Sequence, residues 1–330
     1  YLRTRGIKMY YLQNITDIDD KIIASAKEEK TVPATIAKKY LAIYRRNVKA
    51  LGITTVNTYA PATKFISQIV GQVQILLRKG CAYTIHHDGI YFDIKKFKDY
   101  GKLSRRTALQ AEDGVSRIDE SVNKRNKGDF CLWKFSKNDE PTWNSPFGPG
   151  RPGWHIEDTA ISEHYFGPQY DLHGAGVDLK FPHHEAEIAQ AESVSGRKPF
   201  VKIWMHVGTL LVNGKKMSKS LKNYVSIDDF LKQYSGEVLR FFMLMHHYRQ
   251  PLNYTDALAG EIHAGLGSIK TFLGKLAHIK KRPTTHARHS NILQNVGMFE
   301  DKFHNALEDD FNTPKALGIV FDFISKLQPR

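Results

Sequence analysis

The segment that decides the fold runs from residue 153 to residue 220 and contains four motifs: Gly-Trp-His-Ile-Glu-Asp (153–158), His-Gly-Ala-Gly-Val-Asp (173–178), Phe-Pro-His-His-Glu-Ala-Glu (181–187) and Lys-Met-Ser-Lys-Ser (216–220). Acids, histidines, glycines and lysines occur here at a density that core packing does not require, because charged residues are seldom buried without a partner. We therefore place the functional centre in this segment and interpret the rest of the chain as its support.

Length and composition indicate an ordinary globular protein. The chain has 330 residues, of which 41% are hydrophobic and 25% charged, so it can bury a sizeable core in two or three structural units. No run approaches the roughly 18–20 apolar residues of a membrane span, and no signal peptide is visible, so we expect a cytoplasmic protein. The first residue is Tyr1 instead of methionine, so we expect a fragment that lacks its natural N-terminus.

The formal net charge of +14 indicates a polyanionic partner, most plausibly nucleic acid. A basic surface that serves only solubility is the alternative. Cys81 and Cys131 form no Cys-x-x-Cys pair, and we expect both to be free thiols in a reducing compartment.

The N-terminal third of the chain alternates strands and helices. We expect a strand at 8–15, helices at 21–30, near Pro33 and at 61–79, and a hairpin at 83–94. Asp17 and Asp19, between the first strand and the first helix, fit either a helix cap or a ligand-binding loop, and the sequence does not separate these.

The remaining two thirds begin with a region of different character. Residues 95–152 are rich in charge, proline and glycine, which indicates an inserted module followed by a returning loop. Strand-like sequence resumes at 170–172 and 200–212. From residue 226 onward we expect helices at 227–234, 237–247, 257–281, 292–306 and 317–327.

His183 and Glu187 are the first candidate ligands. If residues 182–193 form a helix, the two side chains project from one face, where they can bind one zinc ion. An exposed ion pair on a helix face is the alternative.

Two further motifs fit a nucleotide. The small residues around Gly176 let a backbone approach a ligand closely, and Asp178 can accept hydrogen bonds from a ribose; a tight turn is the alternative. The lysines at 215–219 repel one another unless an anion offsets them, and a triphosphate is the natural candidate, although a solvated basic loop has the same composition.

Taken together, these segments resemble the class I aminoacyl-tRNA synthetases, and specifically the cysteinyl-tRNA synthetase family of archaeal type. Residues 216–220 match the second signature of the class. The marks of the cysteine family follow in order: Asn-Ile-Thr-Asp-Ile-Asp-Asp-Lys (14–21), Gly-Arg-Pro-Gly-Trp-His-Ile-Glu (150–157), Phe-Pro-His-His-Glu (181–185), Trp-Met-His (204–206), His-Tyr-Arg (247–249), Leu-Asn-Tyr (252–254) and Asp-Asp-Phe-Asn-Thr-Pro (309–314).

The resemblance implies an α/β fold: a Rossmann-like catalytic domain with an inserted module, followed by a helical tRNA-binding region. We expect a catalytic domain at 1–205 with its N-terminal part missing and an insertion at about 95–145. A unit with the Lys-Met-Ser-Lys-Ser motif and the stem contact is expected at 206–250, and a C-terminally truncated helical region at 251–330.

The resemblance also implies a reaction and its cofactors. Cysteine and ATP, with Mg²⁺, give cysteinyl-adenylate, and the cysteinyl group then moves to tRNA(Cys). Zinc in the amino-acid pocket binds the substrate thiolate, since zinc prefers sulfur to a hydroxyl oxygen. The ligands carried over are His183, Glu187 and, where the family has a cysteine, Asp158. A further cysteine ligand and the His-x-Gly-His signature of the family have no counterpart in this sequence, and we expect them in a segment before Tyr1.

Roles for other residues follow from the same resemblance. Thr16, Trp154 and His173 are expected to line the cysteine pocket, Gly176 and Asp178 to hold the ribose, and His206 to lie near the adenine. Lys219 matches the ATP-contacting lysine, with Lys216 as the second catalytic lysine; His155 and Glu157 support the pocket, and His184 and Glu185 lie behind it or on the surface.

Three hypotheses therefore remain: a monomeric cysteine–tRNA ligase, a cysteine ligase of the mycothiol pathway, or a non-catalytic RNA-binding relative of the synthetases. The net charge and the C-terminal helices favour the first.

Overall fold

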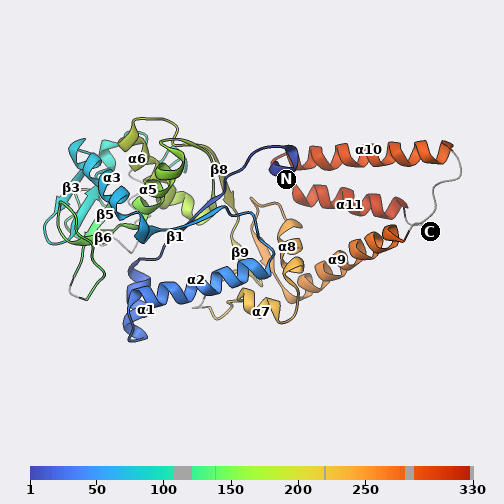
Figure 1. Ribbon diagram of the computed structural model, residues 1–330, viewed down its shortest axis with the longest axis horizontal. Coiled ribbons are helices and arrows are strands. Elements are labelled where there is room, and N and C mark those ends of the chain that lie inside the picture. The colour runs from blue at the N-terminus through green and yellow to red at the C-terminus, as the bar shows by residue number, and fades with distance from the viewer. Residues whose placement is uncertain (107–120, 138, 219–220, 279–285, 328–330) are drawn as a thin grey trace. The chain divides into compact units, whose positions relative to one another are not determined.

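The computed structural model describes residues 1–106, 121–137, 139–218, 221–278 and 286–327 (Figure 1). These residues form two compact units. The larger unit consists of Met9–Arg46 and Thr54–His206, and the smaller unit consists of Tyr1–Lys8, Asn47–Ile53 and Val207–Arg330. The division of the sequence into three domains remains a prediction.

The larger unit begins with a parallel strand pair. Strand β1 (Leu12–Ile15) pairs with β2 (Thr58–Pro61), and the connection between them contains α1 (Asp20–Glu28) and α2 (Pro33–Ala50). Of the strand expected at 8–15, only the second half forms a strand in the structure.

The two aspartates that follow β1 have separate roles. Asp19 caps α1 by accepting a hydrogen bond from the Ile22 backbone N–H at 2.7 Å. Asp17 accepts from the backbone N–H and the hydroxyl of Thr63, at 2.9 and 2.6 Å, and so ties the end of β1 to the chain after β2. The capping hypothesis thus holds for Asp19, and Asp17 is a cross-link.

Helix α3 (Ile66–Arg78) supplies the core of the larger unit. The sequence placed its start at Pro61, but Pro61 is the last residue of β2 and a short 3₁₀ turn (Ala62–Lys64) follows it. Ile69, Val73 and Leu76 are fully buried at helical spacing and pack against the helices that carry the motifs at 153–195.

A four-stranded antiparallel sheet contains both the expected hairpin and part of the inserted module. Its order is β3 (Ala82–Ile85), β4 (Gly89–Phe92), β5 (Phe130–Phe135) and β6 (Gly150–Pro152). The hairpin at 83–94 is confirmed in outline. Residues 107–120 and 138 of the module lie outside the described part of the chain.

Strand β6 leads directly into α5 (Trp154–Phe166), and α6 (Glu185–Ser195) lies in the sequence between the two strands of a further pair. That pair is β7 (Tyr170–Gly176) with β8 (Val201–Val207). The strand expected at 170–172 is longer in the structure, because β7 continues through Gly176. Small side chains fit an extended backbone as readily as a turn, and the alternative of a tight turn at 173–176 is not what the structure shows.

The approach to α6 also differs from the expected helix at 182–193. Phe181 has an extended backbone, the segment Lys180–His184 forms a wide π-type turn, and the regular helix starts only at Glu185. His183 therefore lies in the turn and Glu187 in the first helical turn, yet their side chains still meet.

The smaller unit combines a three-stranded sheet with helices. Strand β9 (Leu210–Val212) pairs antiparallel with β10 (Lys215–Lys216) and parallel with β11 (Leu252–Tyr254). The helices are α7 (Ile227–Leu231), α8 (Gly236–Leu244), α9 (Asp256–Ala277), α10 (His286–Glu308) and α11 (Thr313–Leu327). Thr255 caps α9, and no helix in the described ranges is long and apolar enough to cross a membrane.

Two motifs that are 60 residues apart in the sequence meet in this unit. Asp310, between α10 and α11, accepts a hydrogen bond from the Tyr248 hydroxyl at 2.7 Å and pairs with the Arg249 guanidinium. The hydrogen bond from Arg249 lowers the pKa of Asp310 to about 2. The motifs at 247–249 and 309–314 therefore have a structural role: they join the segment after α8 to the connection between α10 and α11.

Glu185 joins α6 to the segment that follows the β3–β4 hairpin. Its side chain is fully buried and accepts hydrogen bonds from the backbone N–H groups of Gly101, at 3.0 Å, and Ser104. Glu185, which was expected behind the pocket or on the surface, is therefore a buried anchor between α6 and this segment.

We expect Glu185→Ala to lower the free energy of unfolding by about 2–4 kcal/mol, because it leaves two buried backbone donors without an acceptor. Urea unfolding of the full-length protein measures this. Glu29→Ala, which removes an exposed partner of Lys39, is the matched control and should have a much smaller effect. Equal effects of the two substitutions would show that Glu185 is not an anchor.

Candidate metal and amino-acid site

The first turns of α5 and the approach to α6 supply the central side chains of the site. The start of helix α5 is in close contact with the backbone of β5, since a Cβ atom on Gly153 would lie 2.0 Å from the Cys131 carbonyl oxygen. Glycine is therefore required here by close approach of two backbones and not by an unusual φ, which is −73°. This approach fixes where Trp154, His155 and Asp158 emerge.

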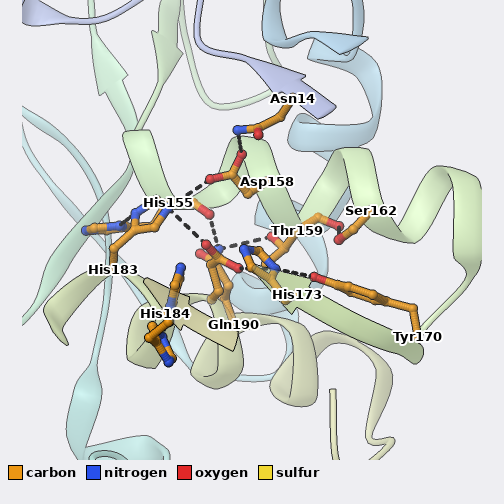
Figure 2. Close-up of polar contacts among 12 residues, drawn as sticks. Asn14, His155, Asp158, Thr159, Ser162, Tyr170, His173, His183, His184 and Gln190 are labelled. Carbon is orange, nitrogen blue, oxygen red and sulfur yellow. Dashed lines mark hydrogen bonds and ion pairs between the residues drawn. The ribbon is translucent and has the colours of Figure 1, made fainter. Parts of the chain in front are cut away.

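Asp158, His183 and Glu187 meet in the interior of the larger unit. Figure 2 shows Asp158 and His183. The His183 Nε2 atom lies 2.8 Å from Asp158 Oδ2 and 2.9 Å from Glu187 Oε1. Side-chain exposure is 10% for Asp158, 4% for His183 and 0% for Glu187. The sequence predicted these three residues as ligands of one metal ion, and the structure places their ligand atoms within 4.8 Å of one another.

Electrostatics show an excess of buried negative charge at this trio. Burial alone would lower the pKa of His183, but the carboxylates of Glu187 and Asp158 outweigh it and raise that pKa to about 10. One imidazolium can balance only one of the two carboxylates. The Glu187 oxygens are buried and face imidazole nitrogens: Oε1 lies 2.9 Å from His183 Nε2, and Oε2 lies 3.7 Å from His173 Nδ1. The negative charge that one imidazolium leaves unbalanced is costly in the interior unless a cation compensates for it.

The donor set fits a divalent cation. One imidazole nitrogen and two carboxylate oxygens are normal ligands of zinc, and the two negative charges match its charge. His173, His184 and Glu187 form a second group of possible ligands, but that group offers a single carboxylate. Charge therefore favours the group with Asp158.

Aromatic rings enclose the trio. Trp154 stacks on His183 with ring centroids 4.4 Å apart, and His173 stacks on Trp204 at 4.9 Å. His173 Nδ1 bonds the Tyr170 hydroxyl at 2.5 Å and lies 3.7 Å from Glu187 Oε2. Two of the three expected pocket residues, Trp154 and His173, thus border the trio.

Thr16, the third expected pocket residue, directly follows β1 and lies next to the Glu157 carboxyl. Burial, and after it the carboxylates of Asp158 and Asp17, raise the pKa of Glu157 well above its ordinary value. Glu157 therefore favours its neutral form beneath the trio, which agrees with a supporting role.

The residues expected near ATP lie at the ends of β7 and β8. Gly176 ends β7, and a Cβ there would lie 2.6 Å from Asp178 Oδ1, so glycine lets the Asp178 carboxylate fold back over the backbone. His206 Nε2 lies 2.9 Å from His184 Nδ1. Burial and the surrounding imidazoles, His173 first, lower the pKa of His184 to about 2, so His184 is neutral.

The lysine motif belongs to the smaller unit. Lys216 ends β10 and is exposed, and Asn223 shapes the loop by accepting from the Ser218 N–H at 2.9 Å and donating to the Lys216 carbonyl at 3.2 Å. Lys219 and Ser220 lie outside the described residues.

Sequence reasoning missed two polar residues, one that contacts the trio and one that contacts the helix carrying Asp158. Asn14, on β1, donates a hydrogen bond to Asp158 Oδ1, and Gln190, on α6, donates to the His155 carbonyl and to Thr159 (Figure 2). Strand β1 reads Leu-Gln-Asn-Ile, so Asn14 is one of two adjacent polar residues and no local signal distinguished it.

Comparison with known proteins identifies the family of the chain. A family model described as "tRNA synthetases class I (C) catalytic domain" matches residues 1–263, and a DALR domain model matches residues 302–328. A cysteine–tRNA ligase of Coxiella burnetii (strain Dugway 5J108-111) is 42% identical over 327 residues, which are 99% of this chain and 68% of the relative. The chain belongs to the class I cysteinyl-tRNA synthetase family.

Other members of the cysteinyl-tRNA synthetase family give similar values. The cysteine–tRNA ligase of Thermoplasma acidophilum is 46% identical over 295 residues, covering 89% of this chain and 65% of the relative. The chain thus spans about two thirds of the length of these relatives. The predicted family and enzyme class, an aminoacyl-tRNA synthetase, are confirmed.

Solved structures confirm the fold. Methionyl-tRNA synthetase of Mycobacterium tuberculosis in complex with methionyl-adenylate superposes with a TM-score of 0.73 at 14% identity, covering 98% of this chain and 75% of that one. The leucyl enzyme of Agrobacterium radiobacter K84, in a ternary complex with tRNA, gives 0.70 at 10% identity and the same coverage. The α/β class I synthetase fold that the sequence predicted is therefore present.

The close approach at Gly153 gives a direct test of the site's framework. We expect Gly153→Ala to destabilise the protein by about 1–3 kcal/mol, because the added methyl group overlaps the Cys131 carbonyl and forces α5 away from β5. Gly71→Ala is the control: it lies inside α3 with nothing within 4 Å, and should stabilise by about 0.5–1 kcal/mol. Thermal unfolding of both variants measures the difference, and a neutral Gly153→Ala would contradict the required contact.

Proposed function

We propose that this chain carries the catalytic site of a cysteine–tRNA ligase. In this reaction the cysteine carboxylate attacks the α-phosphorus of ATP to give cysteinyl-adenylate and diphosphate. The cysteinyl group then passes to the 3′ end of tRNA(Cys), and AMP leaves. Membership of the family supports the reaction, and the observation that supports cysteine as the amino acid is the buried Asp158–His183–Glu187 trio beside Trp154.

In this proposal Asp158, His183 and Glu187 hold zinc. When bound, zinc supplies a Lewis acid that prefers sulfur to a hydroxyl oxygen, which separates cysteine from serine. The chain's own residues prepare the site: Glu187 brings a buried carboxylate that faces His183, and the indole of Trp154 covers one face of His183. Thr16 and His173 line the rest of the amino-acid pocket.

The ATP contacts in this proposal are Gly176, Asp178, His206 and Lys219, and Lys216 is the second catalytic lysine. Asp178 accepts hydrogen bonds from the ribose, and His206 lies against the adenine. Lys219, with Lys216 and Mg²⁺, offsets the negative charge that grows on the phosphates as diphosphate leaves. The net charge of +14 supports tRNA as the polyanionic partner. Cys81 and Cys131 are not joined in a disulfide, which supports the reducing cytoplasm as the compartment. A monomer is part of the proposal.

The direct test uses the full-length protein in two assays. Cysteine-dependent exchange of diphosphate into ATP, followed by charging of tRNA(Cys), supports the proposal. Exchange without charging of tRNA points to the ligase of the mycothiol pathway, and binding of tRNA without exchange points to a non-catalytic relative. Either of these two results would overturn the proposed function.

We expect purified full-length protein to contain about one zinc ion per chain and His183→Ala to lose it, since the substitution removes the ligand atom that faces both carboxylates. Metal analysis by mass spectrometry measures the content. His164→Ala, an exposed histidine on the same α5 helix as Asp158, is the control and should retain zinc. Full zinc content in His183→Ala would refute the ligand assignment.

We expect Lys219→Ala to slow adenylate formation about 100-fold or more while the affinity for cysteine changes little, because the lysine acts on charge that develops in the transition state. Single-turnover adenylation and equilibrium cysteine binding separate the two effects. Lys232→Ala, at an exposed position after α7, controls for loss of positive charge. Equal losses in rate and affinity would contradict the proposed role.

A further inference from the structure

The carboxylate of Asp158 has two oxygens with different partners. Oδ2 lies 2.8 Å from His183 Nε2, inside the trio, and Oδ1 accepts the hydrogen bond from the Asn14 side-chain amide (Figure 2). A carboxylate rotates easily about its last side-chain torsion, which has only broad preferences. A partner on one oxygen is therefore what fixes which oxygen faces the trio.

Asn14 is held rigidly enough to do this. It lies on β1, where it pairs in register with Ala60 of β2, and the Asp17–Thr63 cross-link fixes the chain three residues later. Asp158 is fixed from the other side by the contact of Gly153 with β5. Asn14 on β1 and Asp158 on α5, which are 144 residues apart in the sequence, are thus each held in place where their side chains meet.

The chemical nature of the donor matters. The side-chain amide of Asn14 is neutral, so it satisfies Oδ1 without cancelling the negative charge of Asp158, whereas a lysine or arginine would compete with a bound cation. His183 has an equivalent support, since its Nδ1 atom lies 2.7 Å from His155 Nδ1. Such partners behind a ligand orient it and tune the affinity for metal.

We propose that Asn14 is a positioning residue for the metal site: it holds Asp158 so that Oδ2 is the oxygen presented to zinc. The inference rests on the proposed function, since it presupposes a metal ion at the trio. It assigns a role to Asn14 that applies to a carboxylate ligand and not to a thiolate, because a single sulfur atom has no second donor atom to restrain.

The test compares four full-length proteins by zinc affinity: wild type, Asn14→Ala, Asp158→Cys and the double variant. Competition with a chromophoric chelator gives the dissociation constants. We expect Asn14→Ala to weaken zinc binding about 10-fold or more when residue 158 is aspartate, and less than about 2-fold when it is cysteine. Absorption of the Co²⁺-substituted proteins should shift with Asn14→Ala in the first background only.

Two controls separate this role from general support of the strand. Asn57→Ala changes an exposed asparagine beside the same strand pair, where Asn57 accepts from the Tyr11 N–H, and should leave zinc affinity unchanged. Asn14→Leu keeps the side chain's shape without its donor and should match Asn14→Ala, which protects the test if the alanine variant folds poorly.

The outcomes distinguish this inference from the function on which it rests. Wild-type protein that binds no zinc overturns the metal assignment, and this inference with it. Zinc-binding wild type with an unchanged Asn14→Ala, or equal losses in both backgrounds, overturns the role of Asn14 alone.

Discussion

The structure depends on one buried electrostatic contact, His183 between the carboxylates of Asp158 and Glu187. Three ionisable side chains in the interior cost free energy that close packing of the surrounding elements must offset. The contact forms only if the start of α5 and the start of α6 are brought together. Most of the larger unit, from the sheet at β5 to the core helix α3, serves that placement.

The glutamates of α6 show how the charge is distributed. Glu185, Glu187 and Glu192 are all buried, but two of them are satisfied by the segment after the hairpin. Glu185 accepts from the backbone of Gly101, and Glu192 pairs with the Lys102 ammonium at 2.6 Å. Glu187 instead faces the trio, with Oε1 2.9 Å from His183 Nε2. The same helix therefore uses two acids for anchoring and places the third in the candidate metal site.

Several local expectations from the sequence were wrong for physical reasons that the sequence does not contain. Pro61 is as compatible with the end of a strand as with the first turn of a helix, and pairing of β2 with β1 decided for the strand. The glycine-rich segment at 173–176 extends because β8 pairs with it. Pro182 marks a wide turn and not the start of α6, because Phe181 adopts an extended backbone. In each case tertiary pairing overrode a local preference.

The sequence by itself determined the family and the class of fold, because several family motifs occur along the chain in the family's order. The same motifs grouped Asp158, His183 and Glu187 as candidate ligands of one metal ion. It also determined most helices of the smaller unit, since their apolar spacing is local. Only the tertiary structure decided that Glu187 is fully buried beside Asp158, that Glu185 is an anchor, and that Asn14 reaches Asp158. The last two facts depend on which atoms meet across more than 80 residues of sequence, and no local pattern specifies such a contact.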